Sequence, residues 1–155
     1  MPSPRLLIGR HSQPLAWYAV TTVTSQRKPL FSDAAIAAII RREILTLESE
    51  GWVRSEAWVL MPDHLHWLFQ LRGGSLGTGM QRFKSRSARA IRPLICSTAP
   101  IWQRGYYEHR LRSDEDLIAQ SRYVIANPLR SGLADRIEDY PHWWARSITC
   151  SADLS

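Results

Sequence analysis

The sequence predicts an α+β fold in which helices pack on an antiparallel sheet. Segments with the two-residue period of a strand alternate with segments of helical period, in the order strand, helix, two strands, helix, strand, helix. The two consecutive strands are separated by only a Pro-Asp turn, which favours an antiparallel hairpin. This order suits a sandwich of the split βαβ, ferredoxin-like kind.

The first half of the chain carries clear local signals. Residues 16–24 (AWYAVTTVT) are rich in β-branched and aromatic side chains and predict a strand. Asp33 then offers an N-cap to a helix with apolar residues at helical spacing, and Gly51 ends it. A second strand is expected at about 54–61, and the Pro62-Asp63 turn leads from it into a third.

The second half continues the alternation. Gly73-Gly74 breaks the chain before a helix expected at about 76–91, whose apolar stripe lies opposite a stripe of arginines. A short strand is expected around 106–112. Ser113 and Asp116 form a capping box for a last helix, which is expected to stop at Asn127-Pro128.

Length and composition indicate one globular domain. The chain has 155 residues, of which 45% are hydrophobic, which is enough for a core of its own. We treat residues 1–155 as one domain with an irregular arm at 1–13 and a tail at 144–155. No apolar run approaches ~18 residues, and the N-terminus lacks the apolar segment of a secretory signal. Cys96 and Cys150 show neither metal spacing nor a disulfide framework, so we expect a cytoplasmic protein.

Positive charge is concentrated in one segment. The formal net charge is +6, and no Asp or Glu lies between His64 and Tyr107. That span holds seven cations: Arg72, Arg82, Lys84, Arg86, Arg89, Arg92 and Arg104. Such a block of cations is typical of a protein that binds a polyanion, above all nucleic acid. The alternative is an ordinary basic surface exposed to solvent.

On the helix expected at 76–91, three of these arginines share the side opposite the apolar stripe. Arg82, Arg86 and Arg89 would therefore be exposed and free to meet DNA phosphates. Lys84 lies at the border of the apolar stripe, nearer the sheet, and is a further candidate for DNA contact.

Two histidines stand in an otherwise apolar strand, MPDHLHWLFQL (61–71). Side chains alternate faces along a strand, so Leu65 and Trp67 belong to an apolar face, whereas His64 and His66 point together from the other. Imidazoles at positions i and i+2 can chelate one divalent ion from the same side, provided a third ligand comes from elsewhere. On the pattern alone, ordinary core or surface histidines stay the alternative.

The last expected helix carries an aromatic residue away from its apolar side. Its apolar residues cluster on one face, and Tyr123 and Asn127 project to the opposite one. Four residues apart, the two side chains would stack on one helix face with Cβ atoms ~5–6 Å apart. Tyr123 is therefore either a functional, reactive residue or a structural one whose ring covers a neighbouring side chain.

Several segments together resemble one known family. MPDHLHWLF resembles the histidine–hydrophobic–histidine signature of HUH nucleases, and RYVIANPLRSGL (122–133) resembles the tyrosine-bearing helix of the IS200/IS605-like, single-tyrosine (Y1) transposases. The segments VTSQRKPLF, MQRFKSRSARAI and IWQRGYYEHRLR agree with this. The similarity is greatest to the REP-associated tyrosine transposases and spans about residues 15–143.

The resemblance implies roles for particular residues. His64 and His66 match the paired metal ligands, Asn127 the third ligand and Tyr123 the nucleophile. The implied cofactor is a divalent ion, Mg²⁺ or Mn²⁺. The implied activity is cleavage and joining of single-stranded DNA next to a REP hairpin through a covalent 5′-phosphotyrosine link, in a protein that works as a monomer or homodimer at the nucleoid.

Two other functions stay open from the sequence. A ferredoxin-like module that binds single-stranded nucleic acid without cutting it would use the same basic block, but it would not need the histidine pair together with Tyr123 and Asn127. A metal-dependent phosphoesterase that activates water normally needs more carboxylates, and Asp63 is the only one near the histidines.

Overall fold

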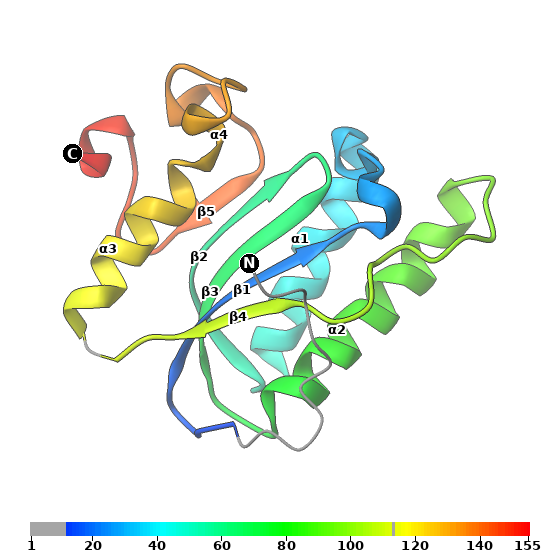
Figure 1. Ribbon diagram of the computed structural model, residues 1–155, viewed down its shortest axis with the longest axis horizontal. Helices are drawn as coiled ribbons and strands as arrows, with labels where there is room; N and C mark the ends of the chain where they lie inside the picture. Colours follow the sequence, from blue (N-terminus) through cyan, green and yellow to red (C-terminus); the bar gives the residue numbers. More distant parts are fainter. Residues whose placement is uncertain (1–11, 113) are drawn as a thin grey trace.

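The computed structural model describes residues 12–112 and 114–155, and in this part of the chain the strands form a five-stranded sheet (Figure 1). The strand order is β4-β1-β3-β2-β5, and every pairing is antiparallel. The first four strands have the order of a split βαβ sandwich, so the predicted α+β fold class is confirmed. The strands are β1 Trp17–Val23, β2 Val53–Met61, β3 His64–Leu71, β4 Tyr107–Arg110 and β5 Trp143–Ala145.

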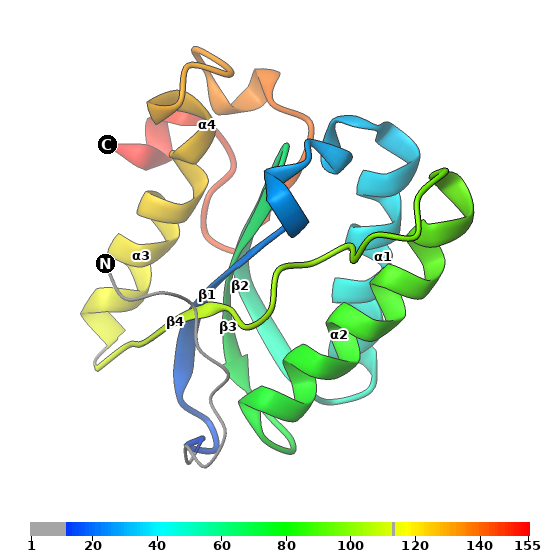
Figure 2. The ribbon, with the colours of Figure 1, turned by 45° about the vertical axis from the view of Figure 1, so that its right-hand side comes forward.

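Helices cover both faces of the sheet. α1 (Ala34–Ser49) and α2 (Leu76–Ile91) lie on one face and α3 (Asp114–Ile125) on the other, which Figure 2 shows with the sheet nearly edge-on. A short helix, α4 (Asn127–Arg130), follows α3. Single 3₁₀ turns occur at Ser25–Arg27, Leu30–Ser32, Arg92–Leu94, Ile137–Asp139 and Ser151–Leu154. Within the described residues, no helix is long and apolar enough to cross a membrane.

Alternation along β3 sends side chains into two separate cores. Trp67 and Phe69 are buried on the face covered by α1 and α2, together with Phe83 of α2. Leu68 is buried on the other face with Val124 of α3. The sequence predicts one core face for this strand. The structure instead buries both, and the histidine face stays open only at the start of β3, before α3 covers it.

Local signals in the sequence account for most element boundaries. The Asp33 carboxylate accepts hydrogen bonds from the backbone N–H groups of Ala35 and Ile36, at 2.8 and 3.2 Å, and caps α1 as predicted. Gly51, one residue beyond the C-cap of α1, has φ +84°, a conformation that glycine adopts without strain. α2 has its predicted bounds, with Ser75 as its N-cap.

The prediction of a C-terminal tail at 144–155 is wrong. Trp143–Ala145 forms β5 and pairs with β2, with Trp144 opposite Trp58. Burial of Ala145 and Ile148 in the core beneath α3 holds this segment against the sheet. The strand has only three residues, too few for an alternating pattern to indicate it.

The last long helix ends close to its predicted stop, but the sequence does not predict the short helix that follows it. α3 ends at Ile125, just before Asn127-Pro128, and this pair begins α4. Proline lacks an N–H and fits the first turn of a helix, where that N–H would have no partner, so the chain starts a new helical turn here. The predicted capping box of Ser113 and Asp116 lies outside the described residues, as do residues 1–11 of the predicted arm.

Candidate active site

The two histidines of β3 direct their Nε2 atoms at each other. These atoms are 3.1 Å apart, and the ring planes are nearly perpendicular, at 86°. Two nitrogens that bind one divalent ion at about 2.0–2.2 Å lie roughly 3.0–3.4 Å from each other. The predicted common direction of His64 and His66 is confirmed, and their spacing fits a pair of metal ligands.

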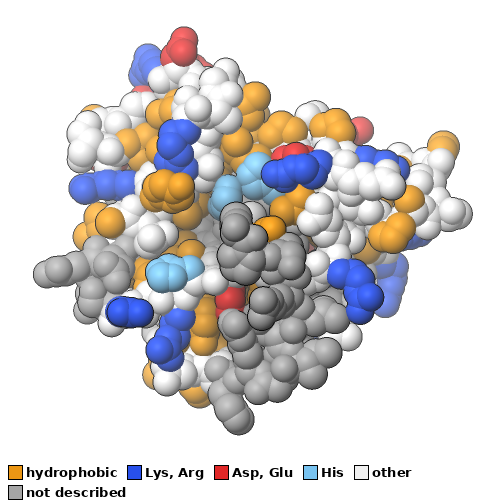
Figure 3. Space-filling view, viewed as in Figure 1, with side chains coloured by type: hydrophobic (Ala, Val, Ile, Leu, Met, Phe, Trp, Pro, Cys, Tyr) orange, Lys and Arg blue, Asp and Glu red, His pale blue; other side chains and the backbone are white. Residues whose placement is uncertain are grey.

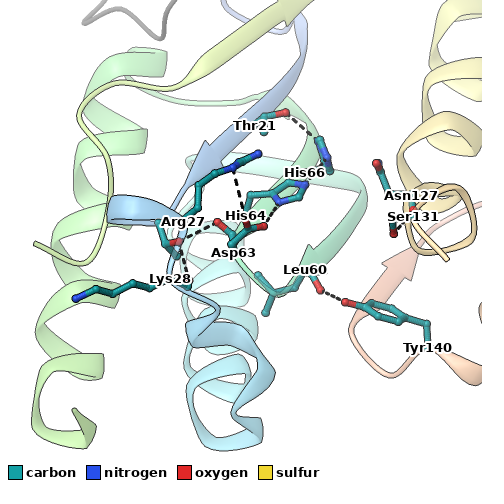
Figure 4. A network of polar contacts seen from close by, with 11 residues as sticks. Thr21, Arg27, Lys28, Leu60, Asp63, His64, His66, Asn127, Ser131 and Tyr140 are labelled. Atoms are coloured by element: carbon teal, nitrogen blue, oxygen red, sulfur yellow. Dashed lines mark hydrogen bonds and ion pairs between the residues drawn. The ribbon is translucent and has the colours of Figure 1, made fainter. Parts of the chain in front are cut away.

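Hydrogen bonds on the outer ring nitrogens fix both imidazoles (Figure 4). His64 Nδ1 donates to the Asp63 carboxylate at 2.6 Å, and His66 Nδ1 lies 2.8 Å from the Thr21 hydroxyl on neighbouring β1. Asp63 in turn lies 3.7 Å from the guanidinium of Arg27. A hydrogen bond donated from Nδ1 leaves the lone pair on Nε2, which is the usual arrangement of metal-binding histidines.

His66 is an uncharged imidazole at neutral pH. Its pKa lies at about 3 because burial, followed by the nearby charges of His64 and Arg130, disfavours the imidazolium. Neutral imidazole is the form that binds metal ions. Its environment therefore keeps His66 in the state that a metal ligand needs.

Tyr123 projects outward from α3. The residue is 60% exposed, although its neighbours Val124 and Ile125 are buried. The guanidinium carbon of Arg130 lies over the tyrosine ring, 3.9 Å from its centroid. The same guanidinium is close enough to His66 to lower the pKa of that imidazole. The stacking of Arg130 on the phenol ring is a contact that the sequence analysis does not predict.

Asn127 lies at the junction of α3 and α4. Its Nδ2 donates to the Val124 carbonyl at 2.9 Å, which leaves Oδ1 available to a cation. Figure 4 shows Asn127 next to Ser131, at the helical turn that follows α3. Among the described residues, no group of three His, Cys, Asp or Glu side chains could hold a metal ion. An amide oxygen, such as Oδ1 of Asn127, is a ligand that hard divalent cations accept.

The arginines predicted to contact DNA lie on α2, across the sheet from the histidines. Arg86 is ion-paired with Glu50 at 2.8 Å and with Glu43 at 3.2 Å, partners that the helical pattern does not predict. Arg82 lies over the ring of Trp52, 5.2 Å from its centroid, and Arg89 is exposed. Contact of these three arginines with DNA stays a prediction.

Lys84 makes structural contacts. Its Nζ donates to the carbonyl oxygens of Gln103 and Gly105, at 2.6 and 2.8 Å, and so joins α2 to the segment that leads into β4. Burial lowers the pKa of Lys84 to about 8. A DNA contact for this lysine stays a prediction, and the ammonium already has two backbone partners.

The histidine pair opens onto a basic face of the molecule. Figure 3 shows histidine side chains near the centre of this face, with Lys and Arg side chains around them and little Asp or Glu surface. His109 of β4 pairs in register with Ala19 and is exposed. It shares the histidine side of the sheet, because Ala19 lies two residues from Thr21 on β1. Such a face attracts an anionic ligand.

Comparison with known proteins identifies the class of protein to which this fold and site belong. Residues 12–127 match the family model described as "Transposase IS200 like". The chain therefore belongs to this family of transposases, enzymes that cleave and rejoin DNA, and the resemblance found in the sequence is confirmed.

Individual relatives narrow the comparison to the REP-associated tyrosine transposases. One from Escherichia coli K12 is 23% identical over 127 residues, which are 81% of this chain and 73% of the relative. A relative from Haemophilus influenzae, described in similar terms, is 28% identical over 95 residues, which are 54% of this chain and 53% of that protein. The solved structure of a REP-associated tyrosine transposase bound to a REP hairpin shares the fold, with a TM-score of 0.74 and 22% identity over 92% of this chain and 82% of that chain.

Proposed function

We propose that this protein is a metal-dependent nuclease and strand transferase that acts on single-stranded DNA beside REP-type hairpins through a covalent intermediate on Tyr123. The observation that carries the proposal is a pair of imidazoles whose Nε2 atoms converge on the face of the sheet that α3 covers, together with an exposed tyrosine on that helix. Membership of the transposase family and relatives named for REP elements supply the class of substrate.

Three uncharged side chains would hold the divalent ion: His64, His66 and Asn127. Mg²⁺ and Mn²⁺ both suit a site that must also accept phosphate oxygens, and imidazole ligands match Mn²⁺ better. When bound, the ion would supply Lewis-acid charge to a non-bridging oxygen of the scissile phosphate. Asp63 and Thr21 hold the two imidazoles in the ligand orientation through their Nδ1 atoms.

Tyr123 would supply the nucleophile. The bond between its phenol oxygen and phosphorus forms while the bond from phosphorus to O3′ breaks. The phenol proton passes to solvent, and O3′ takes up a proton to become a free 3′-OH. The resulting 5′-phosphotyrosine conserves the phosphodiester bond energy, so a 3′-OH can later reverse the step and rejoin the DNA. The exposure of Tyr123 gives a DNA strand direct access to the phenol.

The same residues serve a monomer or a homodimer. The nucleophile of α3 could act on the phosphate held by the histidines of its own chain or, in a homodimer, by those of its partner. Sedimentation of the free protein and of its DNA complex would determine which assembly is active.

Formation of a covalent protein–DNA adduct tests the proposal. Labelled single-stranded hairpin oligonucleotides are incubated with the protein and Mn²⁺ and resolved on denaturing gels. We expect an adduct with the wild type and none with Tyr123→Phe, which should still bind the DNA because only one hydroxyl is removed. Tyr140→Phe, which removes a phenol bonded to the Leu60 carbonyl, is the matched control and should keep the adduct.

Two outcomes would contradict this assignment. An adduct that persists in Tyr123→Phe would mean that another side chain is the nucleophile. Binding of the oligonucleotide by the wild type without any adduct would favour the non-catalytic single-stranded nucleic-acid-binding module.

A further inference from the structure

Arg130 carries a charge without an ionic partner among the described residues. Arg86 is paired with Glu50, and Arg136 with Glu138, whereas the contact recorded for the Arg130 guanidinium is the ring of Tyr123. At 3.9 Å from the ring centroid the planar guanidinium packs against the ring face. Its N–H donors, which lie at the edge of that plane, stay available to an anion.

The backbone fixes Arg130 relative to the other candidate site residues. Its amide N donates to the Ala126 carbonyl at 3.0 Å, and Ser131 Oγ donates to the Asn127 carbonyl at 2.9 Å. These bonds make α4 one unit that carries Asn127 at its start and Arg130 at its end. A single helical turn therefore carries both an amide and a guanidinium, and it follows α3, which lies on the histidine side of the sheet.

We propose that Arg130 is a catalytic residue that binds the scissile phosphate while it is stacked on Tyr123. The guanidinium would stabilise the negative charge that builds up on the non-bridging oxygens as the phenol oxygen attacks. The inference rests on the proposed function, and it adds a phosphate-binding group at the cleavage site, from which the sheet separates the arginines of α2. Arg130 transfers no proton, and the bonds that form and break are those given above.

The chemistry of the guanidinium fits this task better than that of a lysine. Its planar fork can donate two parallel hydrogen bonds to a phosphate. The ring of Tyr123 holds the fork beside the phenol, and hence beside the phosphorus atom that the phenol attacks. A positive charge over the ring face is also attracted by the aromatic π system, so the contact keeps the arginine in place before DNA arrives.

Single-turnover kinetics with matched variants test the role. Arg130→Met keeps the stem of the side chain but removes the guanidinium, and Arg130→Lys keeps only the charge. Arg122→Met is the control, because Arg122 is also exposed and lies next to Tyr123 in sequence, but its Nε donates to the Asp153 carbonyl. The labelled hairpin oligonucleotide is used at saturation with Mn²⁺, and its affinity is measured separately without metal.

We expect Arg130→Met to slow adduct formation by about 10²–10³-fold, the usual cost of removing one donor to a developing oxyanion. Affinity for the oligonucleotide should change by only about threefold, since one cation among several is lost. The rate of adduct formation by Arg130→Lys should lie between the rates of Arg130→Met and the wild type. Arg122→Met should form the adduct at the wild-type rate.

A second substrate distinguishes two possible roles of Arg130: binding of the scissile phosphate and support of the Tyr123 ring. In a methylphosphonate at the scissile position, a methyl group replaces one charged oxygen, in either of two stereoisomers. On the isomer that lacks the oxygen facing Arg130, we expect Arg130→Met and the wild type to react at similar rates, because the charge to be neutralised is gone. An arginine that only supports the ring would cause the same loss on the phosphate and on both methylphosphonates.

The outcomes distinguish this inference from the proposed function. If the wild type forms an adduct and Tyr123→Phe does not, the proposed function holds. If Arg130→Met then forms the adduct as fast as the wild type, or loses the same rate on the phosphate and on both methylphosphonates, only the role of Arg130 is overturned. If the wild type forms no adduct with any hairpin oligonucleotide, the proposed function and this inference fall together.

Discussion

His64 and His66 meet through their Nε2 atoms, while Asp63 and Thr21 hold their Nδ1 atoms from outside. The spacing of the two histidines along one strand is enough to predict that they share a face. Asp63 is adjacent to His64 in sequence, and its contact is local. Thr21 is brought beside His66 by the pairing of β1 with β3, and no local pattern specifies that register. Arg130 was missed for a similar reason, because its stack on Tyr123 depends on the start of a new helix at Asn127.

Replacing both His64 and His66 by alanine should abolish DNA cleavage. Added Mn²⁺ should not restore it, because neither imidazole remains to hold the ion. The adduct assay over a range of Mn²⁺ concentrations measures this, with His142→Ala as a histidine control away from the pair. Recovery of cleavage at high Mn²⁺ would contradict the assignment of the pair as metal ligands.

Replacing Thr21 by valine should weaken metal binding without unfolding the protein. The hydroxyl that orients His66 is lost, and removal of such an orienting partner typically costs about 10–100-fold in metal affinity or activity. Titration with Mn²⁺, followed by electron paramagnetic resonance, measures the affinity.

The next residue along β1 supplies the control for this substitution. Thr22 points to the opposite face, is fully buried, and its Oγ1 has no hydrogen-bond partner among the described residues. Thr22→Val should therefore leave Mn²⁺ affinity unchanged and stability equal or higher. Equal Mn²⁺ affinities in Thr21→Val and the wild type would remove Thr21 from the site.

At the scale of elements, the sequence predicts long periodic segments well and their junctions poorly. The apolar stripe of α2 and the Gly73-Gly74 break before it are local features, and they predict its bounds. The sequence places Tyr123 and Asn127 on one helix face by assuming a regular, unbroken helix. In the structure, the junction of α3 and α4 lies between them. Their relative position therefore depends on a turn formed around Pro128, which a regular helical period does not describe.

Replacing Lys84 by methionine should destabilise the protein. Two hydrogen bonds to the Gln103 and Gly105 carbonyls are lost, and hydrogen bonds of a charged group contribute about 1.5–3 kcal/mol each where the partner is left unpaired. Urea unfolding measures the free energy, and Arg89→Met, at an exposed position of the same helix, should have little effect. Unchanged stability with a selective loss of DNA affinity would instead support Lys84 as a DNA contact.

At the scale of the whole molecule, the sheet separates the histidine face from the arginines of α2. A short single strand bound at the histidines lies on the α3 side, and only DNA that extends around the edge of the sheet can reach Arg82 and Arg89. The block of cations in the sequence predicts a polyanion partner, but sequence order does not show that the cations and the histidines lie on different faces.

The salt dependence of binding should therefore differ between two kinds of DNA. For a hairpin substrate, the double variant Arg82→Ala/Arg89→Ala should reduce the slope of log affinity against log salt by roughly 1–2, one contact for each arginine. For a short single strand that covers only the cleavage site, the slope should not change. Fluorescence anisotropy over a salt series measures both, and equal effects on the two substrates would mean that α2 lies along the cleaved strand itself.

The most direct measurement is mass spectrometry of the peptide that stays attached to DNA after reaction with a hairpin oligonucleotide and Mn²⁺. Our account predicts a nucleotide joined through its 5′ phosphate to Tyr123 in the wild type and no such peptide when His64 and His66 are alanine. A nucleotide on any other residue, or full modification of Tyr123 in the absence of both histidines, would contradict a single site built from the phenol and the imidazole pair.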